Sequence, residues 1–343
     1  MTLRDIAKEV GTTAATVSRV LNGCNRNFSV SPELRAKILA VAERGDYRPN
    51  PLFRGMRTRK NLPLTVIFPS NTLEATHTVS NTAVQTLSEE VHARGRECFF
   101  SFSYSTDRMV FRMPPWKTGA VILPDVRTRE EMSVVRDSGV PVLVVNGIGD
   151  ETCDVIACDS RHNMGLLFNH LHGRGHRRIF YASFTSGMYP SPASASKFLE
   201  HYSVEEREKA YLEQCELHGV APLEGWGTRT QEESVHLDLA LKHRATAVIC
   251  YNHGTAMRLL HEAWLRGMNV PKDLSIVCFN NDPLIAYANP AITCLDPDGA
   301  ALGRAAADQL GRRLEDAEGV LPPQHILIGG RLIVRDSVAA PVR

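Results

Sequence analysis

Residues 13–21 carry the side chains of this sequence that are best placed to bind another macromolecule. In the segment TAATVSRVL, three apolar side chains recur at helical spacing and share one face of a helix. A helix whose other face is small and polar, with one cation, fits the major groove of DNA, where side chains contact base edges and phosphates. That outward face carries Ala14, Ala15, Ser18 and Arg19.

Two short helices joined by a tight turn would position this face. Thr2 can cap a first helix, and Asp5, three residues later, can complete a capping box. Gly11 ends that helix, and Thr12 or Thr13 can cap the second one. The pattern predicts a helix-turn-helix, although a generic amphipathic helical hairpin would show the same pattern.

A third helix and an excess of positive charge favour the DNA-binding interpretation. Ser31, Pro32 and Glu33 provide a cap, a first-turn proline and a first-turn acid for a helix that runs to Gly45. Residues 1–60 contain 12 Lys and Arg against 5 Asp and Glu, a net charge of +7, so the rest of the chain carries −6. A basic head suits a polyanion, and the acidic remainder is expected to have a different partner.

A short basic segment follows the three helices. Asn50 can cap it and Pro51 can begin it, and the sequence continues as LFRGMRTRK. Isolated helices this short rarely persist in water, so we expect the segment to become ordered when it binds an anion. An interdomain linker is the alternative, and the two are compatible if the segment is a linker when free and a helix on DNA.

From Leu64 onward, short apolar runs alternate with segments of helical spacing. Continuous apolar runs flanked by helices are typical of parallel strands in doubly wound α/β sheets. Eight strands exceed one ordinary sheet, so the sequence predicts two lobes, and ligands of such folds bind outside the carboxyl ends of the strands. The predicted strands are 64–68, 97–103, 119–124, 141–145, 154–158, 178–183, 247–251 and 274–279.

Other residues that could support chemistry form no recognisable catalytic or metal site. His170, His172 and His176 lie close together in HLHGRGH, but the first two would face different sides of a helix, so we predict no metal site. The sequence contains no Walker A motif, no G-x-G-x-x-G after a strand and no nucleophile elbow. We therefore expect neither a cofactor nor an enzymatic reaction.

Cysteine usage and hydropathy indicate the compartment. The eight cysteines are scattered without a C-x-x-C pair, and the N-terminus begins with a helical pattern rather than a signal peptide. No window approaches 18 uninterrupted apolar residues, so no membrane span is predicted. We expect a reduced, cytoplasmic protein that does not contact a membrane.

Five stretches together resemble the LacI/GalR (lactose repressor) family. The resemblance spans nearly the whole chain, and the combination of motifs in the head is its most specific part. The stretches are TLRDIAKEVGTTAATVSRVLNG at 2–23, VSPELRAKILAVAERGDYRPNPLFRGMR at 30–57, GHRRI at 175–179, VPKDLSIVCFNN at 270–281 and LIVRDS at 332–337.

The resemblance implies a homodimeric transcription regulator with three parts. An all-α helix-turn-helix head (1–46) and a hinge helix (47–60) would precede a bilobed α/β effector domain (61–340), built from two doubly wound parallel sheets like periplasmic sugar-binding proteins. The chain would cross between the lobes near residues 157, 291 and 323. The first lobe would comprise about 61–156 and 292–322, and the second about 157–290 and 324–340.

The resemblance also implies which residues contact the operator. The family's recognition helix falls on Thr13 to Leu21, and the positions that most often choose operator bases are Ala14 and Ala15. Because alanine offers only a methyl group, base choice would depend on neighbouring side chains, which are Thr16, Ser18 and Arg19. The residues that would mainly position the DNA backbone are Thr2, Asn22, Ser31, Tyr47 and Asn50.

In the hinge, Met56 occupies the position where the family usually has a leucine that inserts into the central minor-groove step. Methionine is flexible but apolar, so it can still separate two base pairs, with Arg54 and Arg57 lining the groove. We expect a bent operator. The alternative is that Met56 is only a loose linker side chain.

The family's effector arginine falls on Arg207, although Ala210 stands where glycine is usual. An arginine fork can bind hydroxyl or carboxylate oxygens. Asn252 is followed by histidine rather than the usual aspartate, and Asn280 replaces the first aspartate of the usual Gly-Phe-Asp-Asp. Both departures remove a negative charge, and an amide can donate as well as accept, so the ligand chemistry of sugar-binding relatives does not transfer directly.

Three further residues complete the predicted effector site. Asp159 stands at the start of the family's Asp-Asn pair, with Ser160 in place of asparagine, and it either faces the effector or only caps the following helix. Ser70 and Asn71 follow the first strand, where the carboxyl end of a parallel sheet offers ligand contacts.

The leading hypothesis is a sequence-specific regulator, a repressor or less often an activator, of double-stranded operator DNA. A small-molecule effector, a sugar or related metabolite, would bind between the two lobes and control operator affinity through its differential affinity for two lobe arrangements. The alternative is a cytoplasmic solute-binding module or enzyme that keeps the bilobed fold, with a vestigial head.

Overall fold

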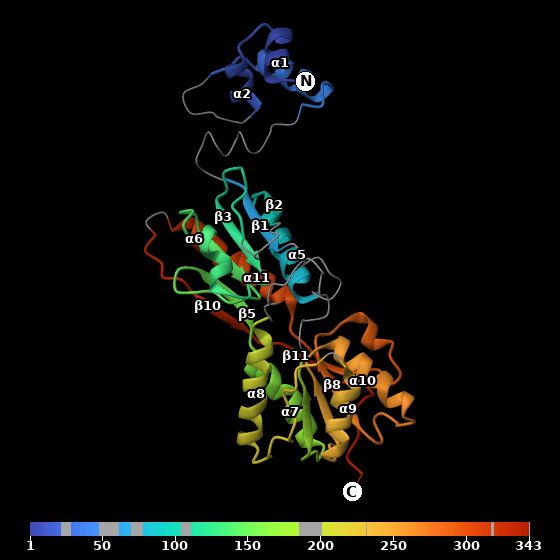
Figure 1. Ribbon diagram of the computed structural model, residues 1–343. Coiled ribbons are helices and arrows are strands. Elements are labelled where there is room, and N and C mark those ends of the chain that lie inside the picture. Colours follow the sequence, from blue (N-terminus) through green and yellow to red (C-terminus); the bar gives the residue numbers. More distant parts are fainter. Residues whose placement is uncertain are drawn as a thin grey trace, which may run out of the picture. The chain divides into compact units, whose positions relative to one another are not determined.

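The computed structural model describes residues 1–21, 29–47, 62–69, 78–103, 111–184, 201–230, 232–316 and 319–342 (Figure 1). It divides into two compact units, a head of Met1–Pro63 with Pro115–Gly119 and a body that holds the other residues. The predicted hinge lies outside the described residues except for Tyr47. Further predicted site residues that lie outside them are Asn22, Asn50, Arg54, Met56, Arg57, Ser70 and Asn71.

The head contains helices α1 (Leu3–Val10), α2 (Ala14–Leu21) and α3 (Pro32–Arg44). The capping box at Thr2 is confirmed, because the Asp5 amide donates to the Thr2 hydroxyl and the Thr2 amide donates to the Asp5 carboxylate at 2.8 Å. Local chemistry thus sets where these helices begin and end.

A small apolar core holds the three helices of the head together. All three contribute to it, and burial of these side chains, rather than helix propensity, stabilises elements this short. The helix-turn-helix predicted from the sequence therefore has the interior that the motif requires. The buried residues are Ile6, Ala7, Val17, Val20, Ile38, Val41 and Ala42.

The first lobe of the body has a six-stranded parallel sheet in the order β10-β5-β4-β3-β1-β2. The nearly continuous apolar sequence of its central strands fits burial on both faces. Its strands are β1 (Leu64–Pro69), β2 (Cys98–Ser103), β3 (Ala120–Pro124), β4 (Val142–Val145), β5 (Asp154–Cys158) and β10 (His325–Ile328).

The second lobe has a five-stranded sheet in the order β11-β9-β8-β7-β6. Four strands are parallel, and β11 pairs antiparallel with β9, which the sequence did not predict. The strands are β6 (Ile179–Ala182), β7 (Ala247–Cys250), β8 (Ser275–Phe279), β9 (Thr293–Asp296) and β11 (Arg331–Ile333).

Helices cover both faces of each sheet, as doubly wound folds require (Figure 1). In the first lobe, α5 (Thr78–Ala93) and α11 (Gly299–Glu315) pack on one face, while η1 (Arg129–Met132) and α6 (Ser133–Arg136) lie toward the other. In the second lobe, α7 (Ser160–Gly173) and α8 (Ser203–Leu217) cover one face, opposite α9 (Glu233–Lys242) and α10 (His253–Leu265).

The chain passes between the lobes three times. The first crossing follows Cys158, close to the predicted residue 157. The second and third predictions, near 291 and 323, place β9 and β10 in the wrong lobes, because β9 pairs with β8 and β10 pairs with β5. Those crossings follow Asp296 and Ile328 instead. Within the described ranges, no helix is long and apolar enough to cross a membrane.

Candidate functional site

The surface of α2 presents several of the predicted DNA contacts. Thr13, Ala15 and Arg19 are exposed, while Ala14 and Thr16 are half-buried. The Thr13 hydroxyl accepts from the Thr16 amide at 3.2 Å and lies 3.0 Å from the Thr16 hydroxyl, so these two side chains cap the start of the helix.

Ser18 does not face outward as predicted. Only 7% of it is exposed, because it lies one turn after Ala14 and next to Val17 at the edge of the buried face of α2. Small side chains at this edge allow the helices of the head to approach closely. Ser18 is therefore removed from the outward face, which keeps Ala15 and Arg19.

The other predicted backbone-positioning residues lie at the ends of the head's helices. Thr2 and Ser31 are exposed N-caps of α1 and α3, and the Ser31 hydroxyl accepts from the Leu34 amide at 3.2 Å. Tyr47 is half-buried and packs against the core of the head. Helix N-termini are favourable neighbours for DNA phosphates because they carry partial positive charge.

In the body, Arg207 is a buried cation on α8. Its Nη1 donates to the carbonyl oxygen of Tyr251 at 2.6 Å, and its guanidinium carbon lies 4.1 Å from the ring centre of Phe279 and 4.7 Å from that of Tyr251. Two aromatic faces stabilise the charge by cation–π attraction. The residue is 6% exposed, and among the described residues its buried Nε has no hydrogen-bond partner. Its hydrogen-bonding capacity is thus only partly used.

Asn280 and Asn252 lie at the carboxyl ends of neighbouring strands, β8 and β7. Asn280 has a left-handed backbone, with φ 70°, and its buried Oδ1 accepts from no described residue. An unsatisfied buried carbonyl is costly, which makes this atom a candidate acceptor for a ligand hydroxyl. Asn252 caps α10, since its Oδ1 accepts from the Thr255 amide at 2.8 Å.

Asp159 caps α7, where its Oδ1 accepts from the His162 amide at 2.8 Å. The structure thus shows the capping role that the sequence offered as one of two alternatives. The neighbouring Ser160 is buried, and its hydroxyl has no partner in the described part of the chain.

The sequence analysis did not identify Asp282, a charged residue close in sequence to Asn280. Asp282 follows Asn280 by two residues, and its carboxylate lies 3.8 Å from Nε2 of His253. Burial lowers the pKa of His253, and this effect outweighs the opposing attraction of Asp282. Asp282 also caps η2 (Pro283–Ala286), since its Oδ1 accepts from the Leu284 amide at 2.9 Å.

The histidines of HLHGRGH do not converge, and no group of three metal-ligating side chains occurs in the described ranges. His176 is 1% exposed, and its two ring nitrogens lie 2.8 Å from the Thr246 hydroxyl and 2.8 Å from the Ala339 carbonyl. Burial lowers its pKa. This neutral imidazole joins the start of β7 to the C-terminal segment.

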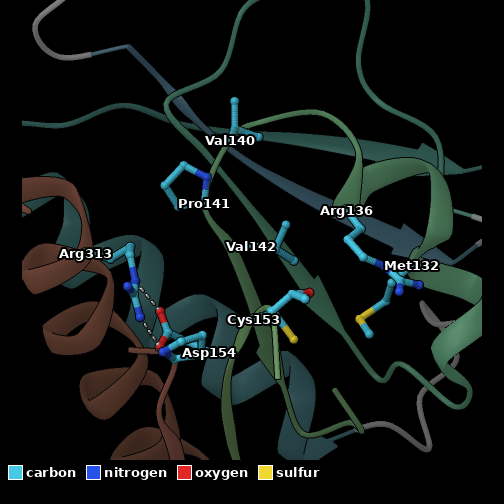
Figure 2. Close-up of a pocket in the computed structure, with 10 residues that line it drawn as sticks. Met132, Arg136, Val140, Pro141, Val142, Cys153, Asp154 and Arg313 are labelled. Carbon is cyan, nitrogen blue, oxygen red and sulfur yellow. Dashed lines mark hydrogen bonds and ion pairs between the residues drawn. The ribbon is translucent and has the colours of Figure 1, made fainter. Parts of the chain in front are cut away.

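A cavity of about 120 Å³ lies in the first lobe, where Val142, Cys153 and Arg313 are among the residues that line it (Figure 2). Val140 and Pro141 precede β4 and Cys153 precedes β5, so the cavity is at the amino ends of these strands. Its two arginines already have partners: Arg136 lies 3.4 Å from Asp150, and Arg313 binds Asp154 through two nitrogens at 2.8 and 2.9 Å. Its charges are compensated, so we do not assign the effector to it.

Two protein-family models match the chain. The model of bacterial regulatory proteins of the lacI family matches residues 2–50, which include all three helices of the head. The model of the periplasmic binding protein-like domain matches residues 168–338, which include the second lobe and the returning segments of the first. Head and body therefore match the two modules that the sequence motifs indicated.

Curated relatives of similar length are regulators of transcription or metabolism. Catabolite control protein A of Staphylococcus xylosus is 27% identical over 309 residues, which cover 85% of this chain and 86% of the relative. The HTH-type transcriptional regulator AscG of Escherichia coli is 26% identical over 362 residues, covering 100% of this chain and 99% of the relative. The similarity thus extends over head and body together.

Solved structures show the same fold. The Lac repressor dimer bound to operator and the anti-inducer ONPF superposes with a TM-score of 0.77 at 18% identity, covering 99% of both chains. The complex of the transcriptional regulator CelR with cellobiose gives 0.65 at 19% identity, covering 98% of this chain and 99% of that one. A helix-turn-helix head, a doubly wound bilobed body and these matches lead to one conclusion: this chain belongs to the LacI family of DNA-binding transcriptional regulators.

Proposed function

We propose that the protein is a homodimeric repressor that acts in the cytoplasm on a pseudo-palindromic operator. The observation that carries the proposal is the capped helix α2, which exposes Thr13, Ala15 and Arg19 on a basic head. Arg19 would contact a guanine edge or a phosphate, and the alanines would leave room for a thymine methyl. Thr16, like Arg19, would reach base edges or phosphates, and contacts that position the backbone would come from Thr2, Asn22, Ser31, Tyr47 and Asn50.

Part of the sequence discrimination would come from the hinge. Because Ala14 and Ala15 offer no hydrogen bonds, the Met56 wedge with Arg54 and Arg57 would add the cost of deforming the central base step, which depends on DNA sequence. Replacing Met56 by Gly is expected to weaken binding to a specific operator more than binding to random DNA, because charge is unchanged. Equal losses on both DNAs would count against the wedge.

Supporting a homodimer, the first lobe leaves an apolar strip at one edge of its sheet. Phe100 and Phe102 lie two residues apart on β2, the edge strand, and therefore share one face of the sheet. Their side chains are 49% and 37% exposed, and both rings stack on Phe68. A second copy of this chain would cover such a strip, as an exposed apolar edge otherwise favours aggregation. The similar Lac repressor structure is a dimer.

The effector would be a small polyhydroxylated molecule held at the carboxyl ends of the strands. Arg207 would donate to its oxygens, and Asn252 and Asn280 would accept from its hydroxyls, while Ser70, Asn71 and Asp159 remain further candidates from the sequence. A sugar has this mixture of donors and acceptors, and similar structures contain cellobiose and glucose. We propose that the protein binds this molecule without transforming it, as its relatives are regulators.

The test is retention of fragments from the source genome by the full-length protein at several salt concentrations, against random DNA as competitor. We expect specific retention that weakens steeply with salt, since phosphate contacts release counterions. No preference over random DNA would overturn the proposal. Addition of cellobiose or glucose to the retained complex then asks whether either sugar changes operator affinity.

A further inference from the structure

The segment 201–203, which leads into α8, makes hydrogen bonds to the first lobe. Its residues belong to the second lobe through α8, yet His201 Nε2 lies 2.9 Å from the carbonyl oxygen of Asn146, which follows β4 of the first sheet. The Tyr202 hydroxyl donates to Asn146 Oδ1 at 3.2 Å. Two consecutive side chains thus hold one residue of the opposite lobe.

The first-lobe side of this contact is a small, buried polar group. Asn146 Nδ2 donates to the Ser80 hydroxyl at 2.9 Å and to Asp125 Oδ1 at 3.1 Å, and Ser80 donates to the same carboxylate oxygen at 2.5 Å. Asp125 and Asn146 both have left-handed backbones, with φ 54°, a conformation that these two residue types tolerate better than most. The hydrogen bonds among these three side chains therefore lie entirely within the first lobe.

Tyr202 binds the first lobe through its ring as well as its hydroxyl. The ring packs against the apolar core beneath β1, β3 and β5, and the hydroxyl accepts from the amide of Cys158 at 3.3 Å. Burial raises the pKa of this phenol well above its ordinary value, so it remains a donor at any physiological pH. We call Ser80, Asp125, Asn146, His201, Tyr202 and Ser203 the interlobe clasp.

The proton positions within the clasp follow from its geometry. A carbonyl oxygen has no hydrogen, so Nε2 of His201 donates to Asn146, and Nδ1 accepts from the backbone amide of Ser203 at 3.4 Å. The Ser203 hydroxyl lies 2.8 Å from Nδ1 and 2.8 Å from the Tyr251 hydroxyl. Ser203 therefore donates to His201, and Tyr251 donates to Ser203, in one directional chain.

This chain ends at the candidate effector residue. Tyr251 accepts the Nη1 proton of Arg207 at its carbonyl oxygen, presents its ring to the guanidinium, and is held on its other side by Phe184, whose ring is parallel at 5.2 Å. Ser203 and Arg207 are also one turn apart on α8. A displacement of Arg207 would therefore affect Ser203 in two ways. It would act through the backbone of α8 and through the hydrogen bond between Tyr251 and Ser203.

We propose that the interlobe clasp couples the position of Arg207 to the packing of the two lobes, with His201, Tyr202, Ser203 and Tyr251 as positioning residues of the regulatory response. The proposal rests on the proposed function in that Arg207 contacts the effector. In this proposal the clasp is a hydrogen-bonded element whose arrangement depends both on Arg207 and on the contact between the lobes. Allosteric coupling requires such a shared element.

Cys158 reports opening of the clasp directly. Its amide binds Tyr202, its thiol lies 3.5 Å from Asn146 Oδ1, and burial raises the pKa of the thiol to about 12. Such a thiol reacts only after local opening. The experiment alkylates the full-length protein with iodoacetamide and follows each cysteine by peptide mass spectrometry, with Cys250 on β7, which is fully buried, as the internal reference.

We expect Tyr251→Phe to increase the labelling rate of Cys158 by roughly 3- to 10-fold, the equivalent of one lost hydrogen bond, while Cys250 is unaffected. The substitution keeps the ring and the carbonyl that bind Arg207. The matched control is Tyr181→Phe, which removes a buried hydroxyl that has no partner among the described residues and should leave both rates unchanged. If Tyr251→Phe does not fold, Ser203→Ala breaks the same link.

A double-mutant cycle tests coupling to Arg207. Arg207→Met alone should also increase labelling of Cys158, and the double variant with Tyr251→Phe should label no faster than the faster single variant, because both act through one element. An unchanged Cys158 rate, an equal rise at Cys250, or fully multiplicative effects would each overturn the proposal. These rates involve neither DNA nor effector, so they are independent of whether the operator or the sugar has been assigned correctly.

Discussion

Two arginines of the body, the half-buried Arg313 and the buried Arg207, differ in how many of their hydrogen-bond donors have partners among the described residues. Arg313 on α11 binds Asp154 through two nitrogens, and it also donates to the carbonyl oxygens of Leu321 and Pro322. Among the described residues, Arg207 on α8 makes one hydrogen bond, to a carbonyl oxygen, and aromatic rings replace the carboxylate.

The difference distinguishes an arginine that stabilises the fold from one that is available to bind a ligand. Asp154 also accepts from Gln309 and from the amide of Gln324, so it joins β5, α11 and the segment before β10 in one satisfied network. Such a network leaves nothing for a ligand to bind. A buried cation with an unused donor costs free energy in the isolated protein, and that cost is recovered when a ligand supplies the partner.

The largest expected effect comes from breaking the satisfied arginine. Asp154→Ala should lower the free energy of unfolding by about 3–5 kcal/mol, because it removes a buried carboxylate and leaves the donors of Gln309, Arg313 and the Gln324 amide without their acceptor. Urea unfolding measures the loss. The control is Asp308→Ala, which removes the 60% exposed partner of Arg94 and should change stability by less than about 1 kcal/mol. Similar losses of unfolding free energy in both variants would show that Asp154 stabilises the protein no more than an exposed ion-pair partner does.

Replacement of Arg207 should instead have a small effect on stability and a large effect on effector binding. Arg207→Met keeps the aliphatic stem of the side chain and removes a buried guanidinium whose Nε has no partner among the described residues, so we expect stability to change by less than about 1.5 kcal/mol. The same variant should bind a confirmed effector roughly 10- to 100-fold more weakly, the value of a charge-assisted hydrogen bond. Calorimetric titration and operator release measure this loss. Stability falling as far as in Asp154→Ala would identify Arg207 as structural.

Two stacked tyrosines extend the comparison to neutral groups. Tyr211 and Tyr181 are fully buried with ring centres 5.5 Å apart, and Tyr211 donates to the Ile179 carbonyl at 2.8 Å, whereas the Tyr181 hydroxyl has no partner in the described ranges. Tyr211→Phe should cost about 1 kcal/mol, while Tyr181→Phe should be neutral or stabilising. Thermal unfolding of the two variants side by side decides this. A larger loss for Tyr181→Phe would mean that its hydroxyl is satisfied.

The smallest expected effect is a change in the pH dependence of stability. Burial lowers the pKa of His176 and of His236, so as pH falls below about 6.5 the unfolded chain takes up protons first. Their contribution is complete above pH 6.5 and declines toward the lower folded-state pKa. His236→Gln, which can still donate to the Thr228 carbonyl, should flatten this decline, and exposed His92→Gln should not. Unfolding measured from pH 7.5 to 5 provides the test.

Local signals predicted most of the fold. The capping residues Thr2 and Ser31 and the eight apolar runs all lead to elements at the expected places, because caps and continuous burial act within a few residues. Strands β9, β10 and β11 were not predicted. They are three or four residues long and lie near sheet edges, where pairing with a distant strand replaces a strong local pattern.

The candidate site was predicted less completely. Arg207 and Asn280 were found because family motifs mark them, and both have unsatisfied buried atoms. The interlobe clasp was missed because Ser80, Asn146 and Tyr202 come from separate segments with no shared spacing. Ser18 was misplaced because a small polar residue at the edge of a helical face can turn either way, and tertiary packing decides.

The path of the chain through the two sheets has a consequence for synthesis on the ribosome. The head closes its core with contacts inside its first 47 residues, so it can fold as soon as it emerges. The first lobe cannot: α5 leaves the exit tunnel more than 200 residues before α11, its packing partner, and β5 leaves it more than 160 residues before β10. Until α11 has left the exit tunnel, the apolar face of α5 lacks its cover. Nascent chains that stall before α11 should therefore be substrates for chaperones or proteases, even though their heads are already complete.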